Sequence, residues 1–159
     1  MVIISDTSPI TNLIQIGQLE LLHALFGTIT IPQSVFQELA YYEKQERIVS
    51  GCNWIIVKKV GNRKDVKQLS KYLDLGEAEA IVLAKEYQAD LLIIDERRGR
   101  NAAKEEGVEI IGLLGILVRA KQAGHIVVLR PLLDKLIDEI GFRVSRRLYR
   151  IVLDTVGES

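Results

Sequence analysis

The sequence predicts an α/β fold in three layers, with a central parallel sheet of about five strands between two layers of helices. Short apolar runs alternate along the chain with stretches of helical periodicity. One run, Leu91 to Ile94, contains no polar residue and is typical of a strand covered on both faces. Right-handed crossovers between parallel strands place helices on both sides of the sheet, so this alternation predicts an α/β/α sandwich.

Five short runs rich in β-branched side chains are expected to form the strands. The first is followed directly by Asp6, and the fourth ends at Asp95. The last run is a weaker candidate, because Glu109 interrupts it. The expected strands lie at 2–5, 28–31, 54–57, 91–94 and 108–111.

The stretches between these runs carry helical signals. Ser8 and Pro9 are suited to the N-cap and the first helical position of the first helix. The Ala-rich stretch that begins at Gly76 is apolar on two sides, which indicates a helix packed between neighbours. Two or three further helices are expected from about residue 112 onward. The earlier helices are expected at 9–16, 19–26, 32–42, 65–73 and 76–88.

Composition limits the class of protein. The chain has 159 residues and no linker-like or repeated segment, so we expect one domain over residues 1–159. Its 21 basic and 21 acidic residues balance, so a polyanionic partner must be held by a local site. A lone Cys52 excludes an internal disulfide and fits a cytoplasmic location. No apolar run is long enough for a membrane span, and no signal peptide is expected.

Asp6 and Asp95 are the first candidates for chemistry. Each follows an apolar strand, and the carboxyl ends of parallel strands face the crevice in which ligands bind. We therefore expect the two carboxylates to meet in one cleft. The alternative is that each Asp caps the helix after it. Ser8 is already suited to cap the helix after Asp6, which favours a different role for Asp6.

Three glutamates on predicted helices need separate treatment. Glu38 falls on the apolar stripe of its helix, where it is either a functional carboxylate or the partner of a basic residue. Glu77 and Glu79 are two positions apart, so they point to opposite faces of their helix. Glu77 shares its face with apolar residues and is the inward candidate, although Asp74 and Glu77 also have the spacing of a capping box. Both interpretations of Glu77 remain open.

Four carboxylates in one pocket predict a metal ion. Crowded negative charges repel one another and raise each other's pKa unless a cation neutralises them. Ligands that are all oxygen favour Mg²⁺ or Mn²⁺ over zinc. Such sites serve phosphoryl transfer, in which the metal activates water and stabilises the leaving oxygen of a phosphodiester.

Four motifs together resemble the PIN-domain family in their order and spacing, over residues 2 to about 125. The resemblance is closest to a prokaryotic PIN-like subgroup, and many relatives are the toxin half of toxin–antitoxin pairs. These toxins are metal-dependent ribonucleases that dimerise and are silenced by a small antitoxin protein. The motifs are Asp6-Thr7-Ser8-Pro9, Val35-Phe36-Gln37-Glu38-Leu39, Gly76-Glu77-Ala78-Glu79-Ala80-Ile81 and Leu92-Ile93-Ile94-Asp95.

The resemblance implies a catalytic quartet of acids and a set of ligands for the metal. The sequence departs from the family in two places. The third acid is Glu rather than Asp, and Arg97 replaces a further acid two positions after the last Asp. The implied quartet is Asp6, Glu38, Glu77 and Asp95, of which Asp6, Asp95 and Glu77 would bind the metal. Ser8 matches a hydroxyl beside the metal, and Arg97, Arg98 and Arg100 are candidate phosphate contacts.

The leading hypothesis is a Mg²⁺- or Mn²⁺-dependent ribonuclease for single-stranded or looped RNA, working as the toxin of a toxin–antitoxin pair. The alternative is a catalytically degenerate PIN-like module that binds nucleic acid or protein. A haloacid-dehalogenase-like phosphatase would need an Asp at Ser8, and a Rossmann enzyme would need a Gly-rich turn there. Apolar residues in the carboxyl-terminal helices predict a homodimer or a helical partner; they are Leu132, Leu133, Leu136, Ile137 and Ile140.

Overall fold

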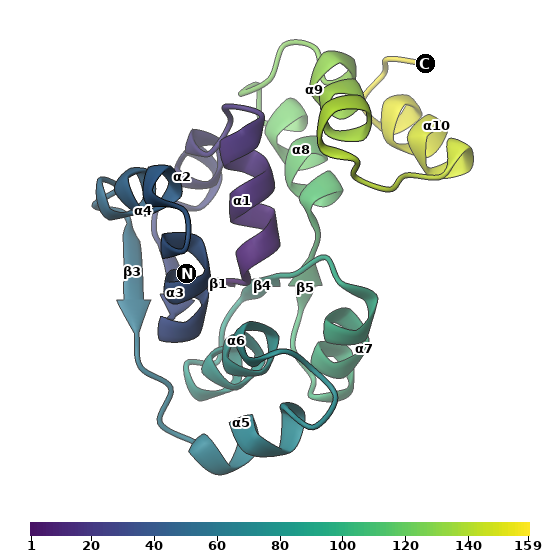
Figure 1. Cartoon of the computed structure of the whole chain (residues 1–159). Helices are drawn as coiled ribbons and strands as arrows, with labels where there is room; N and C mark the ends of the chain where they lie inside the picture. Colours follow the sequence, from purple (N-terminus) through teal and green to yellow (C-terminus); the bar gives the residue numbers. More distant parts are fainter.

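The computed structural model describes all 159 residues and contains one sheet of five parallel strands. The strand order is β3-β2-β1-β4-β5. The expectation of a three-layer α/β/α fold with a parallel sheet is confirmed (Figure 1). The strands are β1 (Ile3–Ser5), β2 (Ile29–Pro32), β3 (Ile55–Lys58), β4 (Leu91–Ile93) and β5 (Ile110–Ile111).

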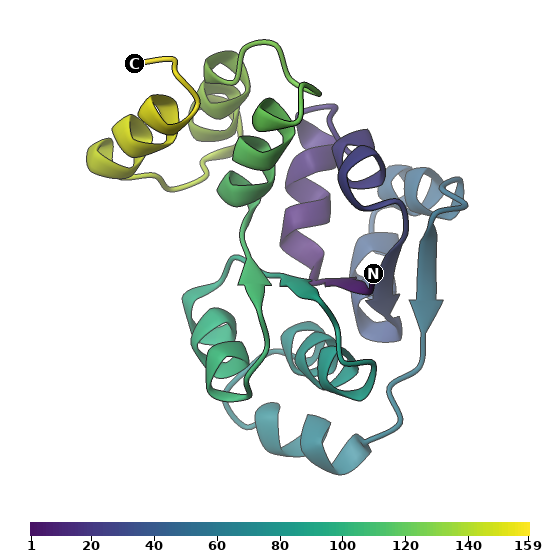
Figure 2. The same cartoon turned by 180° about the vertical axis from the view of Figure 1, so that it is seen from behind.

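Helices cover both faces of the sheet, as the alternating sequence pattern predicts. One layer consists of α5 (Arg63–Leu69), α6 (Leu75–Glu86) and α7 (Arg97–Glu105) (Figure 1). The helices of the other layer come from both ends of the chain (Figure 2). They are α1 (Thr7–Gln15), α2 (Glu20–Phe26), α3 (Gln33–Ala40), α4 (Glu43–Ser50), α8 (Leu113–Gln122), α9 (Arg130–Lys135), the π-helical turn η1 (Leu136–Ile140) and α10 (Arg146–Thr155).

The two faces of the strands supply two separate hydrophobic cores. Ile3 of β1 packs in the larger core and Ile4 packs in the smaller one, because successive side chains of a strand point to opposite faces. In β4, Ile93 packs in the larger core and Leu92 packs in the smaller one. Each of these side chains is almost wholly buried, which explains why the strands are apolar throughout.

The carboxyl ends of β1 and β4 form the centre of one edge of the sheet. Ser5 is in register with Ile93, and the backbone N–H of Asp6 donates to the Ile93 carbonyl at 2.9 Å. The chain crosses from one layer to the other between these strands, so this is the switch point of the sheet. Helix α6 leads into β4, and its amino terminus therefore lies at the same edge.

Several element boundaries differ from the sequence-based expectations. Helix α1 begins at Thr7, and Asp6 rather than Ser8 occupies the N-cap position. Strand β5 is limited to Ile110 and Ile111, which are in register with Leu92 and Ile93 of β4, although the Glu109 carbonyl also accepts from the Leu92 N–H at 2.8 Å. Helix α5 ends at Leu69, earlier than the periodicity indicated.

The carboxyl-terminal leucines have a structural role. Leu133 and Leu136 are fully buried in the larger core, and Leu132, Ile137 and Ile140 pack against it. These five residues, from which we expected a homodimer or a helical partner, therefore pack within the chain itself. They are no evidence for a homodimer. No helix combines the length and apolar character that crossing a bilayer requires.

Candidate acidic site

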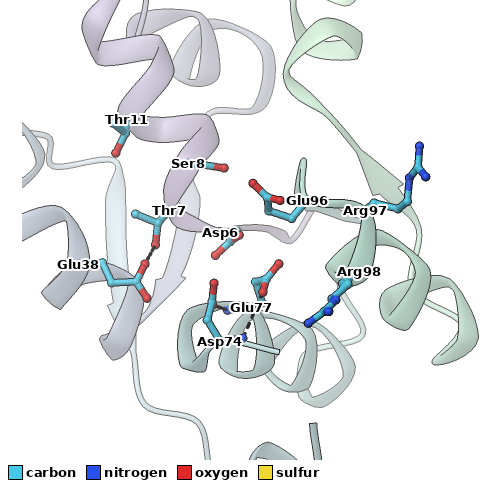
Figure 3. A pocket seen from close by; sticks show the side chains of 10 residues that line it. All are labelled: Asp6, Thr7, Ser8, Thr11, Glu38, Asp74, Glu77, Glu96, Arg97 and Arg98. Carbon is cyan, nitrogen blue, oxygen red and sulfur yellow. Dashed lines mark hydrogen bonds between the residues drawn. The ribbon is translucent and has the colours of Figure 1, made fainter. Parts of the chain in front are cut away.

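A cavity of about 480 Å³ opens at the switch point of the sheet. It contains no hydrophobic lining residue, and five of its side chains are carboxylates (Figure 3). Helices α1, α3, α6 and α7 contribute to its wall, together with the residues directly before α1, α6 and α7. The lining residues are Asp6, Thr7, Ser8, Thr11, Glu38, Asp74, Glu77, Glu96, Arg97 and Arg98. We refer to this space as the acidic cavity.

Asp6 lies at the centre of the acidic cavity because β1 ends directly before it. Its side chain makes no capping hydrogen bond to α1, although Asp6 holds the N-cap position. The residue is 5% exposed. Burial raises the pKa of Asp6 to about 7, helped by the nearby negative charges of Asp74 and Glu77 and opposed by the Thr7 N–H. The carboxylate is thus available to a ligand and costly to ionise alone.

Glu77 fulfils both of the interpretations that the sequence left open. It closes a capping box at the start of α6: its N–H donates to Asp74 Oδ1 at 2.8 Å, and its Oε1 accepts from the Asp74 N–H at 3.2 Å. Its second oxygen, Oε2, is buried and has no hydrogen-bond partner. Burial and the neighbouring Asp74 raise the pKa of Glu77 to about 7. The capping box therefore positions Glu77 and leaves one oxygen free.

Glu38 lies at the rim of the acidic cavity on α3. Its Oε2 accepts a hydrogen bond of 2.6 Å from Thr7 Oγ1, which ties it to the start of α1 (Figure 3). Partial burial raises the pKa of Glu38, and the Thr7 hydroxyl opposes the rise. The start of α6 approaches very closely, since a Cβ atom added to Gly76 would lie 2.5 Å from Glu38 Oε1. Glycine at this position makes room for the Glu38 carboxylate.

Glu79 points away from the acidic cavity, as the helical geometry predicted, but it does not face solvent. It is 5% exposed and accepts hydrogen bonds from the Ser34 N–H at 3.0 Å and from Arg63 Nη1 at 2.5 Å. Burial disfavours its charge, yet these partners hold the pKa of Glu79 below its usual range. Glu79 is a buried structural carboxylate that joins α6 to α3 and α5.

Asp95 does not share the cleft of Asp6, contrary to our expectation. Its Oδ1 accepts from the Leu113 N–H at 2.9 Å, so it caps the start of α8 across 18 residues of sequence. This bond turns the carboxylate into a neighbouring pocket, where its buried Oδ2 has no partner. Burial raises the pKa of Asp95, opposed by the Leu113 N–H and by Arg100. The amino terminus of α8 is the physical reason for this orientation.

Two carboxylates of the acidic cavity are missing from the sequence-based set. Asp74 enters as the capping residue of α6, and Glu96 enters as the residue after Asp95. The capping-box spacing of Asp74 with Glu77 is the signal that could have identified the first. Glu96 directly follows Asp95 and comes one position before Arg97, which stands where relatives often have a further acid.

The proposed substrate contacts are divided between two hollows. Ser8 and Arg98 line the acidic cavity, Arg100 lines the neighbouring pocket, and Arg97 lines both. Ser8 is the second residue of α1, so it has no capping role and its hydroxyl is open to the cavity. Arg97 extends away from the carboxylates (Figure 3).

The donor atoms of the acidic cavity fit a hard divalent cation. All of its acidic ligands are oxygens, Glu77 Oε2 lacks a partner, and Asp6 and Glu77 both have a pKa raised to about 7. No group of three or more carboxylate, His or Cys side chains converges closely enough to hold an ion together. Mg²⁺ typically keeps several waters and takes one or two protein carboxylates, which this arrangement can supply.

A comparison with family models decides the family. The model described as PIN domain matches residues 2–158, which is nearly the whole chain. The chain belongs to the PIN-domain family. No curated protein matches this PIN domain.

Membership confirms the resemblance seen in the motifs and gives the acidic cavity a context. PIN domains have a nuclease-type fold and generally use divalent metals. In this PIN domain the acidic cavity lies at the carboxyl edge of the sheet, where α/β folds bind ligands.

Proposed function

We propose that this PIN domain is a Mg²⁺- or Mn²⁺-dependent endoribonuclease that hydrolyses phosphodiester bonds in single-stranded or looped RNA. The observation that carries the proposal is the acidic cavity, whose lining contains five carboxylates and only two basic residues, Arg97 and Arg98. Such an excess of negative charge around the unpartnered Glu77 Oε2 is unfavourable in the absence of a cation. A divalent ion would relieve it.

The residues take distinct roles in this proposal. Asp6 and Glu77 would hold the ion, because both are buried and each has an oxygen free of capping bonds. When bound, the ion supplies an activated water and stabilises the leaving oxygen. Glu38 orients a water from the rim, where Thr7 fixes its carboxylate.

The remaining roles are those of the residues that contact phosphate and of Asp95. Arg98 and Ser8 contact the phosphate at the cavity, and Arg97 and Arg100 act beside it. Asp95 acts as a positioning residue: through Leu113 it fixes the start of α8 beside Arg100.

The direct test is cleavage of a mixed-sequence RNA, followed on a denaturing gel with Mn²⁺ and with a chelator. Wild-type protein should produce fragments only with Mn²⁺. Asp6→Asn should lower the rate on the order of 100-fold, since it weakens the hold on the metal. Lys64→Ala, an exposed change on α5, is the control and should keep full activity. RNA binding without cleavage under any metal would instead support the catalytically degenerate module.

The biological setting is the second part of the proposal. We infer a toxin of the cytoplasm that forms a homodimer and is held inactive by a small antitoxin protein. Apolar side chains that remain exposed support a protein partner: Val127 is 85% exposed, and Ile151 on α10 is 49% exposed. Light scattering should give twice the chain mass, and Ile151→Glu should shift it to one chain mass if α10 forms the contact.

A further inference from the structure

A second hollow of about 720 Å³ lies beside the acidic cavity and has the opposite charge. Four basic side chains line it: Arg97, Arg100 and Lys104 on α7, and Arg143 just before α10. The only acid in its wall is Asp95. Because Arg97 lines both hollows, they are neighbours. We refer to this second hollow as the basic pocket.

Most of the basic charge in this pocket is uncommitted. Arg97, Lys104 and Arg143 are exposed and form no ion pair or side-chain hydrogen bond within the protein. Arg100 donates from Nη1 to the Ile94 carbonyl at 3.0 Å and keeps its other donors. Asp95 is occupied at Oδ1 by the Leu113 N–H. Cations that the protein leaves unpaired around a hollow suit a ligand with several negative charges.

A third hollow, of about 390 Å³, adjoins the acidic cavity at Glu38. Its wall includes Leu75 and the two tyrosines between α3 and α4, Tyr41 and Tyr42, and we refer to it as the aromatic platform. Tyr41 is 81% exposed and Tyr42 is 62% exposed. Their rings meet edge to face at 85°, which leaves ring faces open to a ligand. Glu38 lines both this platform and the acidic cavity, so these hollows are neighbours as well.

We propose that one single strand of nucleic acid runs across all three hollows, with a base stacked on the aromatic platform and the phosphates beyond the cleavage point in the basic pocket. The proposal rests on the proposed function, since it places the scissile phosphate in the acidic cavity. Stacking faces beside a basic groove are the pattern by which proteins bind single strands without reading sequence. A free phosphate would bind in the basic pocket but would not reach the aromatic platform. Glu38 and Arg97 each line two adjacent hollows, and this row of neighbouring hollows favours a polymer as the ligand.

Equilibrium binding of a labelled single-stranded RNA tests the path. We would use roughly 12 nucleotides, within the span that such grooves cover, with Ca²⁺ in place of Mn²⁺ to limit cleavage. Fluorescence anisotropy at several salt concentrations gives the affinity and its salt dependence. The first variant, Lys104→Ala/Arg143→Ala, removes two cations of the basic pocket. The second, Tyr41→Ala/Tyr42→Ala, removes the aromatic platform. The control, Lys64→Ala/Lys67→Ala, removes two exposed cations of α5.

The two halves of the path predict different signatures. Loss of two phosphate contacts should make the slope of log affinity against log salt shallower by about 1.4, at about 0.7 per contact for a single strand. Loss of the tyrosines should weaken binding about tenfold or more and leave the slope unchanged, because stacking releases no counterions. The control should keep both the slope and the affinity of wild type.

Different results would contradict the binding path and the proposed nuclease activity. If the basic-pocket variant keeps the slope of the control while wild type still cleaves RNA, the path is wrong and the proposed function stands. If both signatures appear but wild type cleaves nothing with Mn²⁺, the path stands and the nuclease proposal is wrong. A short acidic peptide that binds the basic pocket while RNA does not would also overturn the path, in favour of a protein ligand.

Discussion

Glu77 and Glu79 lie two residues apart on α6 and are equally buried, at 5% exposure, yet only Glu79 has a cation beside it. Arg63 and the Ser34 N–H bind the two oxygens of Glu79, whereas Glu77, which lines the acidic cavity, has a buried Oε2 without a partner. The same residue type on the same helix is thus fully hydrogen-bonded at one position and has an unpartnered oxygen at the other.

This contrast predicts opposite consequences for one substitution. Glu77→Gln should keep the capping box, because Gln serves at that position too, but it should abolish most metal-dependent cleavage. Glu79→Gln should lower the unfolding free energy by about 1–3 kcal/mol, because Arg63 loses the negative charge with which it pairs. The folded variant should keep its activity. Urea unfolding and cleavage rates measure the two effects. Equal losses of activity in the two variants would contradict the conclusion that Glu77 and Glu79 point to opposite faces of α6.

The pKa of Asp6 predicts how stability depends on pH in the metal-free protein. Burial among Asp74, Glu77 and Glu38 raises this pKa to about 7, so the folded state binds the proton more tightly than the unfolded chain does. The contribution of Asp6 is therefore present at low pH and is lost as the pH rises from about 4 to about 7, by up to about 4 kcal/mol.

Asp6→Asn isolates that contribution. With chelator present, the variant and wild type should have similar stability near pH 4, and the variant should become more stable by a few kcal/mol above pH 7. Urea unfolding across this pH range measures the difference. The exposed Asp154→Asn serves as control and should follow wild type at every pH. A constant offset between Asp6→Asn and wild type would mean that Asp6 ionises normally.

Asp6 and Asp95 should respond differently to metal. Mn²⁺ at about 100 times its Kd should stabilise wild type by roughly 2.7 kcal/mol. Asp95→Asn should keep that gain, because Asp95 lies outside the acidic cavity and Asn can still accept from the Leu113 N–H. Asp6→Asn should lose most of it. Thermal melts with Mn²⁺ and with chelator compare the three proteins. Loss of the gain in Asp95→Asn would show that this carboxylate turns toward the metal when one is bound.

The capping role of Asp95 gives a separate expectation. Asp95→Ala should lower the unfolding free energy by about 1–2 kcal/mol relative to Asp95→Asn, because it leaves the Leu113 N–H without an acceptor. Urea unfolding of the two variants in chelator measures this difference. Identical stabilities would mean that the hydrogen bond to Leu113 contributes little.

Gly76 should separate activity from stability. A Cβ atom at this position would meet Glu38 Oε1 at 2.5 Å, so Gly76→Ala should push the Glu38 carboxylate out of place. Stability should change by less than about 1 kcal/mol, because alanine favours the helix and Glu38 is a flexible side chain at the rim. Cleavage should fall about tenfold. Gly61→Ala, whose Cβ would come no nearer than 3.5 Å to its neighbours, should leave the cleavage rate unchanged.

The local sequence was enough to predict the layers and the place of Asp6. Uninterrupted apolar strands such as Leu91 to Ile93 require cover on both faces, and the helical stretches between strands provide it. A residue that directly follows a central parallel strand lies at the carboxyl edge whatever its side chain does, so Asp6 was placed correctly. The rotation of about 100° per residue on a helix likewise separated Glu77 from Glu79.

The direction in which Asp95 points was decided only by the tertiary structure. Asp6 and Asp95 look alike in sequence, each at the end of an apolar strand, but the start of α8 lies beside Asp95 and offers it the Leu113 N–H. That donor is 18 positions away, and no local pattern encodes the distance between them. The burial of Glu79 has the same origin, because Ser34 and Arg63 come from other elements. Sequence periodicity specifies which face a side chain occupies, whereas its partner on that face depends on how distant segments pack.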